Sequence, residues 1–182
     1  TEREPHYPFP VIVPIVSASA IDTLAKGELD LLVEPRGKRL GRHAAALYPM
    51  RIVAVGPGAV GPARSKLEVR ALDGLPLATL PSDSLVRTLL VEAAASAGIA
   101  LDIVFESRDP SALVALARDG LCTAVLHDEI RAQGARSREL VHGRRALTVP
   151  LWLAWAPDAT LSPAARALRD VMLRRAKRHK AA

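Results

Sequence analysis

The segments Leu-Ala-Lys-Gly-Glu-Leu-Asp-Leu-Leu-Val at residues 24–33 and Leu-Ala-Arg-Asp-Gly-Leu-Cys-Thr-Ala-Val-Leu at residues 116–126 repeat one local design. In each segment a glycine, Gly27 or Gly120, separates the end of a helical pattern from a short apolar run. Glycine readily adopts the left-handed conformation that ends a helix, and a short apolar run is typical of a buried strand. The repeat predicts two similarly built α/β lobes. Ligands of such proteins bind at strand carboxyl ends and at domain interfaces, so we expect the function to lie between the lobes.

Composition limits the class of protein. The chain has 182 residues, of which 49% are hydrophobic, and this excludes a disordered protein. Neither an apolar run of about 18 residues nor a leader pattern occurs, so we expect a cytoplasmic protein with no membrane partner. The single cysteine, Cys122, excludes an internal disulfide and a cysteine-cluster metal site. Because the first residue is Thr1 and not Met, we expect a fragment or a processed chain.

The net charge of +6 is concentrated at the C-terminus. Five of the basic residues lie in a tail without acidic residues: Arg174, Arg175, Lys177, Arg178 and Lys180. A basic last turn complements the helix dipole, so a solvated helix end is favoured over a phosphate-binding arm. Only 3% of the residues are aromatic, which leaves little for stacking on bases. The sequence is therefore not interpreted as a DNA-contacting surface. A basic nucleic-acid module stays as an alternative, and it predicts salt-sensitive DNA binding that is lost when residues 174–182 are removed.

Strands and helices are expected to alternate along the chain. The expected strands cover residues 11–16, 29–33, 51–55, 77–80, 101–105, 121–126 and 147–155, the last interrupted by Pro150. The expected helices run from Ser17 or Ser19 to Lys26, from Ser84 to Gly98, from Ser107 or Asp109 to Gly120, and onward from Ser162-Pro163. The last helix is predicted to bury Leu161, Ala165, Leu168 and Met172. Residues 36–42 and the polar segment 128–145 are expected to be irregular.

A set of motifs in a fixed order resembles a known family. The run Gly-Glu-Leu-Asp-Leu-Leu-Val at 27–33 is similar to a strand motif in the effector-binding domain of LysR-type transcriptional regulators. The resemblance covers nearly the whole chain. Its other motifs are Tyr7-Pro8, residues 50–55, residues 72–76, the helix at 82–90, residues 113–116 with 120–125, and residues 155–166.

The resemblance implies a type 2 periplasmic-binding-protein fold, which is α/β with two lobes joined by two crossover segments. Lobe I would comprise residues 1–53 plus 148–182, and lobe II residues 54–147. The family's first strand and most of its first helix precede the position of Tyr7, so this part of lobe I is expected to be absent. The implied function is that of an effector-sensing and dimerising domain. Promoter DNA would be bound through an N-terminal winged helix-turn-helix that this sequence lacks, and the assembly would be a homodimer or homotetramer.

Hydroxyl groups at helix starts are the first candidate effector ligands. Ser17 and Ser19 precede or begin a helix of lobe I, and Ser82 and Ser84 hold the corresponding place in lobe II. Free N–H groups at helix starts suit a small carboxylate or another anion. For each serine, simple helix capping is the more frequent role. Asp83 would repel an anion unless Arg87 pairs with it.

The residues that follow apolar strands are the second group of candidates. Glu34, Ser107 and His127 are expected to line the cleft, although an ordinary strand exit is at least as frequent. The histidines lack metal-ligand spacing and no G-x-S-x-G turn occurs, so we expect neither a metal, nor a cofactor, nor catalysis. A solute-binding protein or an enzyme on the same bilobed fold stays as the alternative function.

Overall fold

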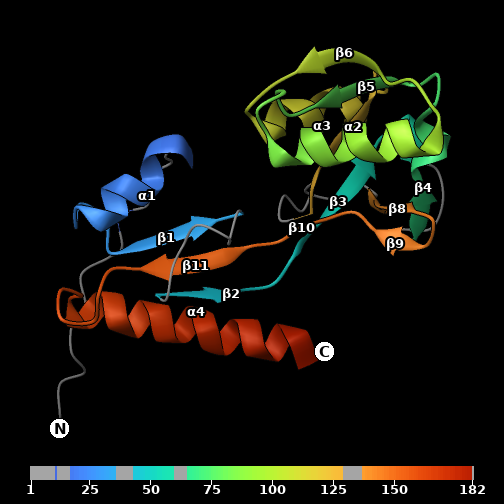
Figure 1. Cartoon of the computed structure of the whole chain (residues 1–182). Coiled ribbons are helices and arrows are strands. Elements are labelled where there is room, and N and C mark those ends of the chain that lie inside the picture. The colour runs from blue at the N-terminus through green and yellow to red at the C-terminus, as the bar shows by residue number, and fades with distance from the viewer. Residues whose placement is uncertain (1–10, 12–16, 36–42, 60–64, 129–136, 182) are drawn as a thin grey trace, which may run out of the picture. The chain divides into compact units, whose positions relative to one another are not determined.

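A computed structural model describes residues 11, 17–35, 43–59, 65–128 and 137–181 (Figure 1). The expected strand at 11–16 and the loop at 36–42 lie outside this part of the chain, except for Val11 itself. The chain divides into two compact units, one of Thr1–Tyr48 with Pro150–Ala182 and one of Pro49–Val149. They are called unit 1 and unit 2 below. The lobe limits taken from the family resemblance remain a prediction.

Unit 1 is built on a small antiparallel sheet. Its elements are α1 (Ser17–Ala25), β1 (Leu31–Glu34), β2 (Ala44–Ala46), β11 (Trp152–Trp155) and α4 (Pro163–Ala181), with strand order β1-β11-β2. Ala20 and Leu24 of α1 are buried with Leu32 of β1, Ala154 of β11 and Ala165 of α4. The sequence places these small and branched residues on the inner faces of the elements, and this packing holds unit 1 together.

The glycines of the two repeated segments end helices as predicted. Gly27 follows α1 with φ +75°, its N–H donates to Leu24 O, and the next N–H donates to Thr23 O. Gly120 has φ +77° and repeats this pair of bonds onto Ala117 O and Leu116 O. Such paired bonds satisfy the last carbonyls of a helix and need a left-handed residue. The helix, glycine and strand order is therefore confirmed in both units.

Unit 2 contains a larger mixed sheet. Its strands are β3 (Met50–Val55), β4 (Lys66–Glu68), β5 (Pro76–Thr79), β6 (Asp102–Glu106), β7 (Thr123–His127), β8 (Ser137–His142), β9 (Arg145–Ala146) and β10 (Thr148–Val149). Its helices are α2 (Leu85–Ala97) and α3 (Pro110–Arg118), with short 3-10 turns at Pro57–Ala59 and Val69–Leu72. The main strand order is β4-β8-β3-β7-β5-β6, and β10 and β9 pair with β3 and β8. Strand β5 lies between β6 and β7 and pairs with both in parallel.

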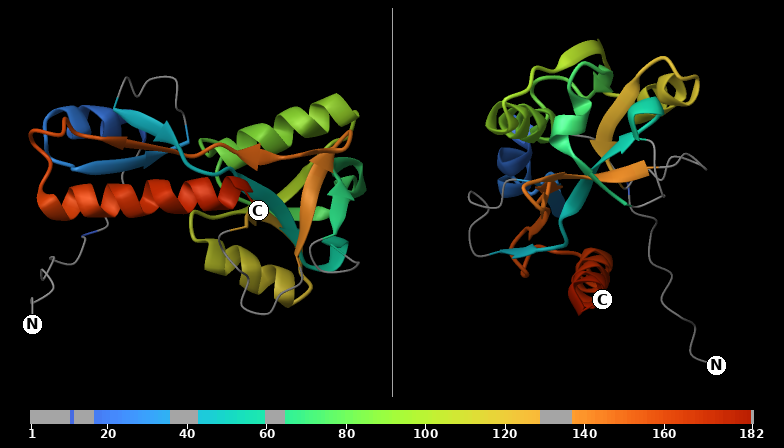
Figure 2. Two further views of the ribbon diagram at one scale, coloured as in Figure 1. Left: turned by 90° about the horizontal axis from the view of Figure 1, so that it is seen from below. Right: turned by 90° about the vertical axis from the view of Figure 1, so that its right-hand side faces the viewer.

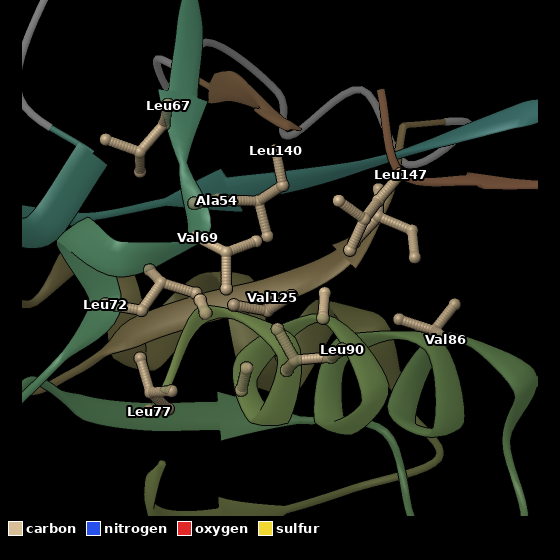
Figure 3. Close-up of a cluster of buried hydrophobic side chains, with 14 of the residues drawn as sticks. Ala54, Leu67, Val69, Leu72, Leu77, Val86, Leu90, Val125, Leu140 and Leu147 are labelled. Carbon is tan, nitrogen blue, oxygen red and sulfur yellow. The ribbon is translucent and has the colours of Figure 1, made fainter. Parts of the chain in front are cut away.

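The two helices of unit 2 cover opposite faces of this sheet. Along β5, Leu77 is buried in a cluster with α2, and the next residue, Ala78, is buried in a cluster with α3. Because successive strand residues point to opposite faces, α2 and α3 must lie on opposite sides. Figure 3 shows the first cluster, where Leu90 of α2 lies near Val125 of β7. This layering fixes where the amino-terminal ends of both helices lie.

Three predictions about elements are wrong. The polar segment 128–145, whose residues 129–136 lie outside the described part, contains β8, which pairs with both β3 and β4. A polar strand gives no hydrophobic periodicity, and its place in the sheet comes from pairing with distant strands. Strand β1 includes Glu34, which is only 3% exposed, whereas Val33 is 46% exposed. In α4, Leu168 is 37% exposed, and Met172 is only partly buried.

No helix in the described part of the chain is long and apolar enough to cross a membrane.

Candidate functional site

Three parallel strands of unit 2, β5, β6 and β7, have their carboxyl ends on the same side of the sheet. This side is called the edge below. Thr79, the last residue of β5, is level with Glu106 of β6 on one side and with Val125 of β7 on the other. The bonds of Thr79 hold this edge together, because its hydroxyl donates to Val125 O at 2.9 Å and its carbonyl accepts from the N–H of Ser107 at 3.2 Å. The segments after β5 and β6 then enter α2 and α3 directly (Figure 1). Two helix amino-termini and three strand ends therefore converge within unit 2.

The serines of this edge order its two loops. Ser84 is the N-cap of α2, and its Oγ accepts from the N–H of Val86 at 3.2 Å. Ser107 Oγ accepts from the N–H of Asp109 at 3.0 Å, and Asp109 caps α3 through Ser111. Capping, the more frequent role of such serines, is thus present at Ser84. Ser82 is exposed and Ser107 is half-buried, so both lie within reach of solvent.

Two ion pairs tie the loops and strands of the edge together. Arg108 lies 2.5 Å from Asp83 and joins the loop after β6 to the loop after β5. Arg87 of α2 lies 3.0 Å from Glu106, so the residue that pairs with Asp83 is Arg108 and not Arg87. The hydrogen bond from Arg108 lowers the pKa of Asp83 below its ordinary value of 3.8. The negative charge of Asp83 is therefore balanced by Arg108 at neutral pH.

His127 closes the third strand of the edge. It is half-buried at the end of β7, where it pairs in register with Ile52 of β3. The next residue, Asp128, accepts a bond from the Arg51 N–H at 3.0 Å and donates its own N–H to Arg51 O. Asp128 thus fixes the end of β7, directly beside the half-buried His127.

The remaining predicted ligands belong to unit 1. Ser17 is the first residue of α1 and Ser19 lies in its first turn, so both occupy the start of that helix. Glu34 ends β1 and is buried. The structure therefore brings four of the predicted ligands to one edge of unit 2: Ser82, Ser84, Ser107 and His127. The other three, Ser17, Ser19 and Glu34, belong to unit 1.

Sequence reasoning missed Arg108 and Thr79. Arg108 lies in the loop between a strand and a helix. Its partner, Asp83, is distant in sequence, so no local pattern indicates the pair. Thr79 was expected only as part of a buried strand, and its hydroxyl gave no separate signal. No group of three or more metal-ligating side chains occurs among the described residues. The edge offers hydroxyls, backbone N–H donors and guanidinium groups, a set suited to a small polar or anionic molecule.

A comparison with protein-family models matches residues 11–177 to the LysR substrate binding domain. The chain belongs to this family. LysR substrate-binding domains are ligand-sensing parts of transcription regulators and not enzymes, so the predicted function class is confirmed. The predicted type 2 periplasmic-binding-protein fold is confirmed as well. A search of curated protein sequences found no match.

Several solved structures share the fold at low sequence identity. The effector-binding domain of QuiR in complex with shikimate has a TM-score of 0.66 and 18% identity over 90% of this chain and 79% of its own. The bromide-bound regulatory domain of HypT from Salmonella typhimurium has a TM-score of 0.63 and 18% identity over 87% of this chain and 77% of its own. Full-length CbnR with its target DNA has a TM-score of 0.65 and 16% identity over 90% of this chain. The chain spans only 55% of that CbnR chain.

Proposed function

We propose that this LysR substrate-binding domain senses a small carboxylate or another anion at the edge formed by β5, β6 and β7. The observation that supports this proposal is the convergence of three strand ends on the amino-termini of α2 and α3. The N–H groups at a helix start carry partial positive charge, and the hydroxyls beside them add oriented donors. Because Arg108 balances the charge of Asp83, that carboxylate does not prevent an anion from binding.

In this proposal Ser82 and Ser107 donate to the effector, Ser84 orders the start of α2, and His127 supplies a donor from β7. That Ser17, Ser19 and Glu34 of unit 1 bind the effector stays a prediction from the sequence. Two related structures support the chemical class, since QuiR holds shikimate, a carboxylic acid, and HypT holds a bromide ion. A solute-binding protein or an enzyme is not favoured, since the family is one of regulators.

A thermal-shift screen tests the proposal. Small carboxylates, beginning with shikimate, and sodium bromide are added at millimolar concentrations to the 182-residue chain. A ligand at 100 times its Kd stabilises the folded state by about 2.7 kcal/mol, which raises the unfolding temperature measurably. The double variant Ser82→Ala/Ser84→Ala is expected to lose this shift, and calorimetric titration gives the change in Kd.

A matched variant separates binding from capping. Ser162→Ala removes the serine bond to the Ala165 N–H at the start of α4, a loss similar to that of the Ser84 bond to Val86. Each cap is worth about 1 kcal/mol, so both variants are expected to unfold at a lower temperature. Only the Ser82/Ser84 variant should lose the effector response. An unchanged Kd in that variant would place the effector elsewhere.

We also propose that two or four copies of the chain assemble in the cytoplasm. Promoter DNA would then be bound through a separate N-terminal domain. Strand β6 is at the end of the sheet order, and Val104 and Phe105 on it are 55% and 40% exposed. Apolar side chains on an edge strand suit coverage by a second copy. Light scattering on the purified chain should give a dimer mass or more, and Val104→Asp should give the monomer mass.

A further inference from the structure

The net charge of helix α4 equals the net charge of the whole chain. The helix contains seven arginine or lysine residues and one aspartate, so its net charge equals the +6 of all 182 residues. Figure 2 shows α4 as one continuous helix that runs to the C-terminal end of the chain. The excess positive charge is therefore confined to one element.

Four exposed basic residues near the C-terminal end of α4 lie on one face of the helix. Arg174, Arg175, Lys177 and Arg178 are all exposed. With 3.6 residues per turn they fall within an arc of about 160°. Ala165 and Ala176, which are 7% and 3% exposed, lie on the opposite side of the helix. The helix thus buries its small residues and presents a continuous basic face outward.

These four residues differ from Arg169, one turn earlier. The guanidinium of Arg169 pairs with Asp158 and Asp170 and lies over the ring of Trp155, so it is committed to the packing of unit 1. Among the described residues, no carboxylate forms an ion pair with the four exposed basic side chains. No carboxylate of the described residues therefore neutralises these charges, and a polyanion can do so by displacing solvent ions.

We propose that the face formed by Arg174, Arg175, Lys177 and Arg178 contacts the phosphate backbone of double-stranded DNA. This proposal goes beyond effector sensing and does not depend on it. Charge complementarity supports duplex DNA as the partner, and the family to which the chain belongs regulates transcription. The contact requires no bases, because phosphate contacts position a protein without reading sequence. The scarcity of aromatic residues therefore does not oppose it.

Fluorescence anisotropy with a labelled mixed-sequence duplex tests the proposal on the full 182-residue chain. Four phosphate contacts give a slope of about −3.6 for log K against log salt, so affinity should fall roughly 150-fold over a fourfold rise in salt. The variant R174Q/R175Q/K177Q/R178Q should lose nearly all of this binding. Glutamine forms helices about as well as arginine and lysine, so circular dichroism should show an unchanged fold.

Two further variants make the test specific. R70Q/R118Q/R144Q/R145Q removes the same charge from exposed positions of unit 2 and should keep the wild-type slope. R174K/R175K/R178K keeps the charge of α4 and should bind within about threefold of the wild type, since phosphate contacts need only positive charge. Effector-induced thermal shifts should be the same in all of these variants, which separates this proposal from that of the effector site. No duplex binding at low salt, or equal losses in the α4 variant and the unit 2 variant, would overturn it.

Discussion

At the scale of single residues, the ion pair of Asp83 and Arg108 reduces the repulsion between Asp83 and an anion at the candidate site. The Arg108→Gln variant should raise the pKa of Asp83 toward its ordinary value of 3.8, because the hydrogen bond that favours the carboxylate is lost. A carboxyl NMR titration measures this pKa, and Arg118→Gln, at the end of α3, serves as the control. An unchanged pKa in Arg108→Gln would show that the ion pair does not form in solution.

The same pair has a defined effect on stability. A carboxyl group whose pKa is lowered by folding contributes stability at pH values above its unfolded pKa, and the contribution is lost as the pH falls through the folded pKa. The side chains of Asp83 and Arg108 are 54% and 70% exposed, so solvent keeps this contribution small. The role of the pair is therefore to balance charge at the site.

Gly56 illustrates a residue fixed by close backbone approach. Its φ is +110°, and a Cβ there would lie 2.8 Å from Cys122 O and 3.0 Å from Ala117 Cβ. Gly56→Ala should cost the strain of a left-handed residue, about 1–2 kcal/mol, plus about 1–3 kcal/mol of overpacking. Gly74 has φ +70°, and a Cβ there would have no atom within 4 Å. Gly74→Ala should therefore cost only the strain of the left-handed conformation. Urea unfolding measures both, and equal losses would contradict the role assigned to packing.

At the scale of elements, α2 shows how one helix divides its residues between core and solvent. Leu90 is fully buried and the adjacent Val91 is 44% exposed. Leu90→Ala should reduce the free energy of unfolding by about 2–5 kcal/mol, because it leaves a cavity between α2 and the sheet. Val91→Ala should change it by no more than about 0.5 kcal/mol. Thermal or urea unfolding of the two variants checks the assignment of faces.

The helices of unit 2 were predictable because their signals are local. Ser84 and Gly98 bound α2, and Asp109 with Pro110 starts α3, as the sequence indicated. Strand β8 was not predictable, since its polar residues gain their place only by pairing with β3 and β4. The exposure of Leu168 was missed because it lies about 60° around the helix axis from the buried Ala165, at the side of the face that α4 buries.

At the scale of the whole molecule, protection of the backbone should follow the order of strands. Strand β3 is flanked by β7, β8 and β10, whereas β6 pairs only with β5 among the described strands. In hydrogen exchange of the Val104→Asp variant, which should be monomeric, amides of 52–55 should therefore exchange more slowly than those of 103–106. Equal rates in the two strands would mean that the sheet opens as a single unit.

The four candidate ligands of unit 2 were found from local patterns, namely serines before helices and polar residues after strands. The register of β5, β6 and β7 aligns the ends of the strands, and this brings the four residues to one edge. Arg108 and its link to Asp83 lie outside such patterns, because an ion pair between two loops depends on how the strands beneath them pair. The effector contacts of all seven predicted residues remain predictions.

The sequence by itself determined the helix ends, the alternation of helix and strand, the family and the position of the excess charge. These features depend on backbone preferences and on the order of residues along the chain. Only the tertiary structure decided that Arg108 neutralises Asp83, that β8 enters the sheet and that the basic face of α4 is exposed and lacks ion pairs within the described part of the chain. Each of these depends on contacts between residues far apart in sequence, or on which side of a helix the core covers.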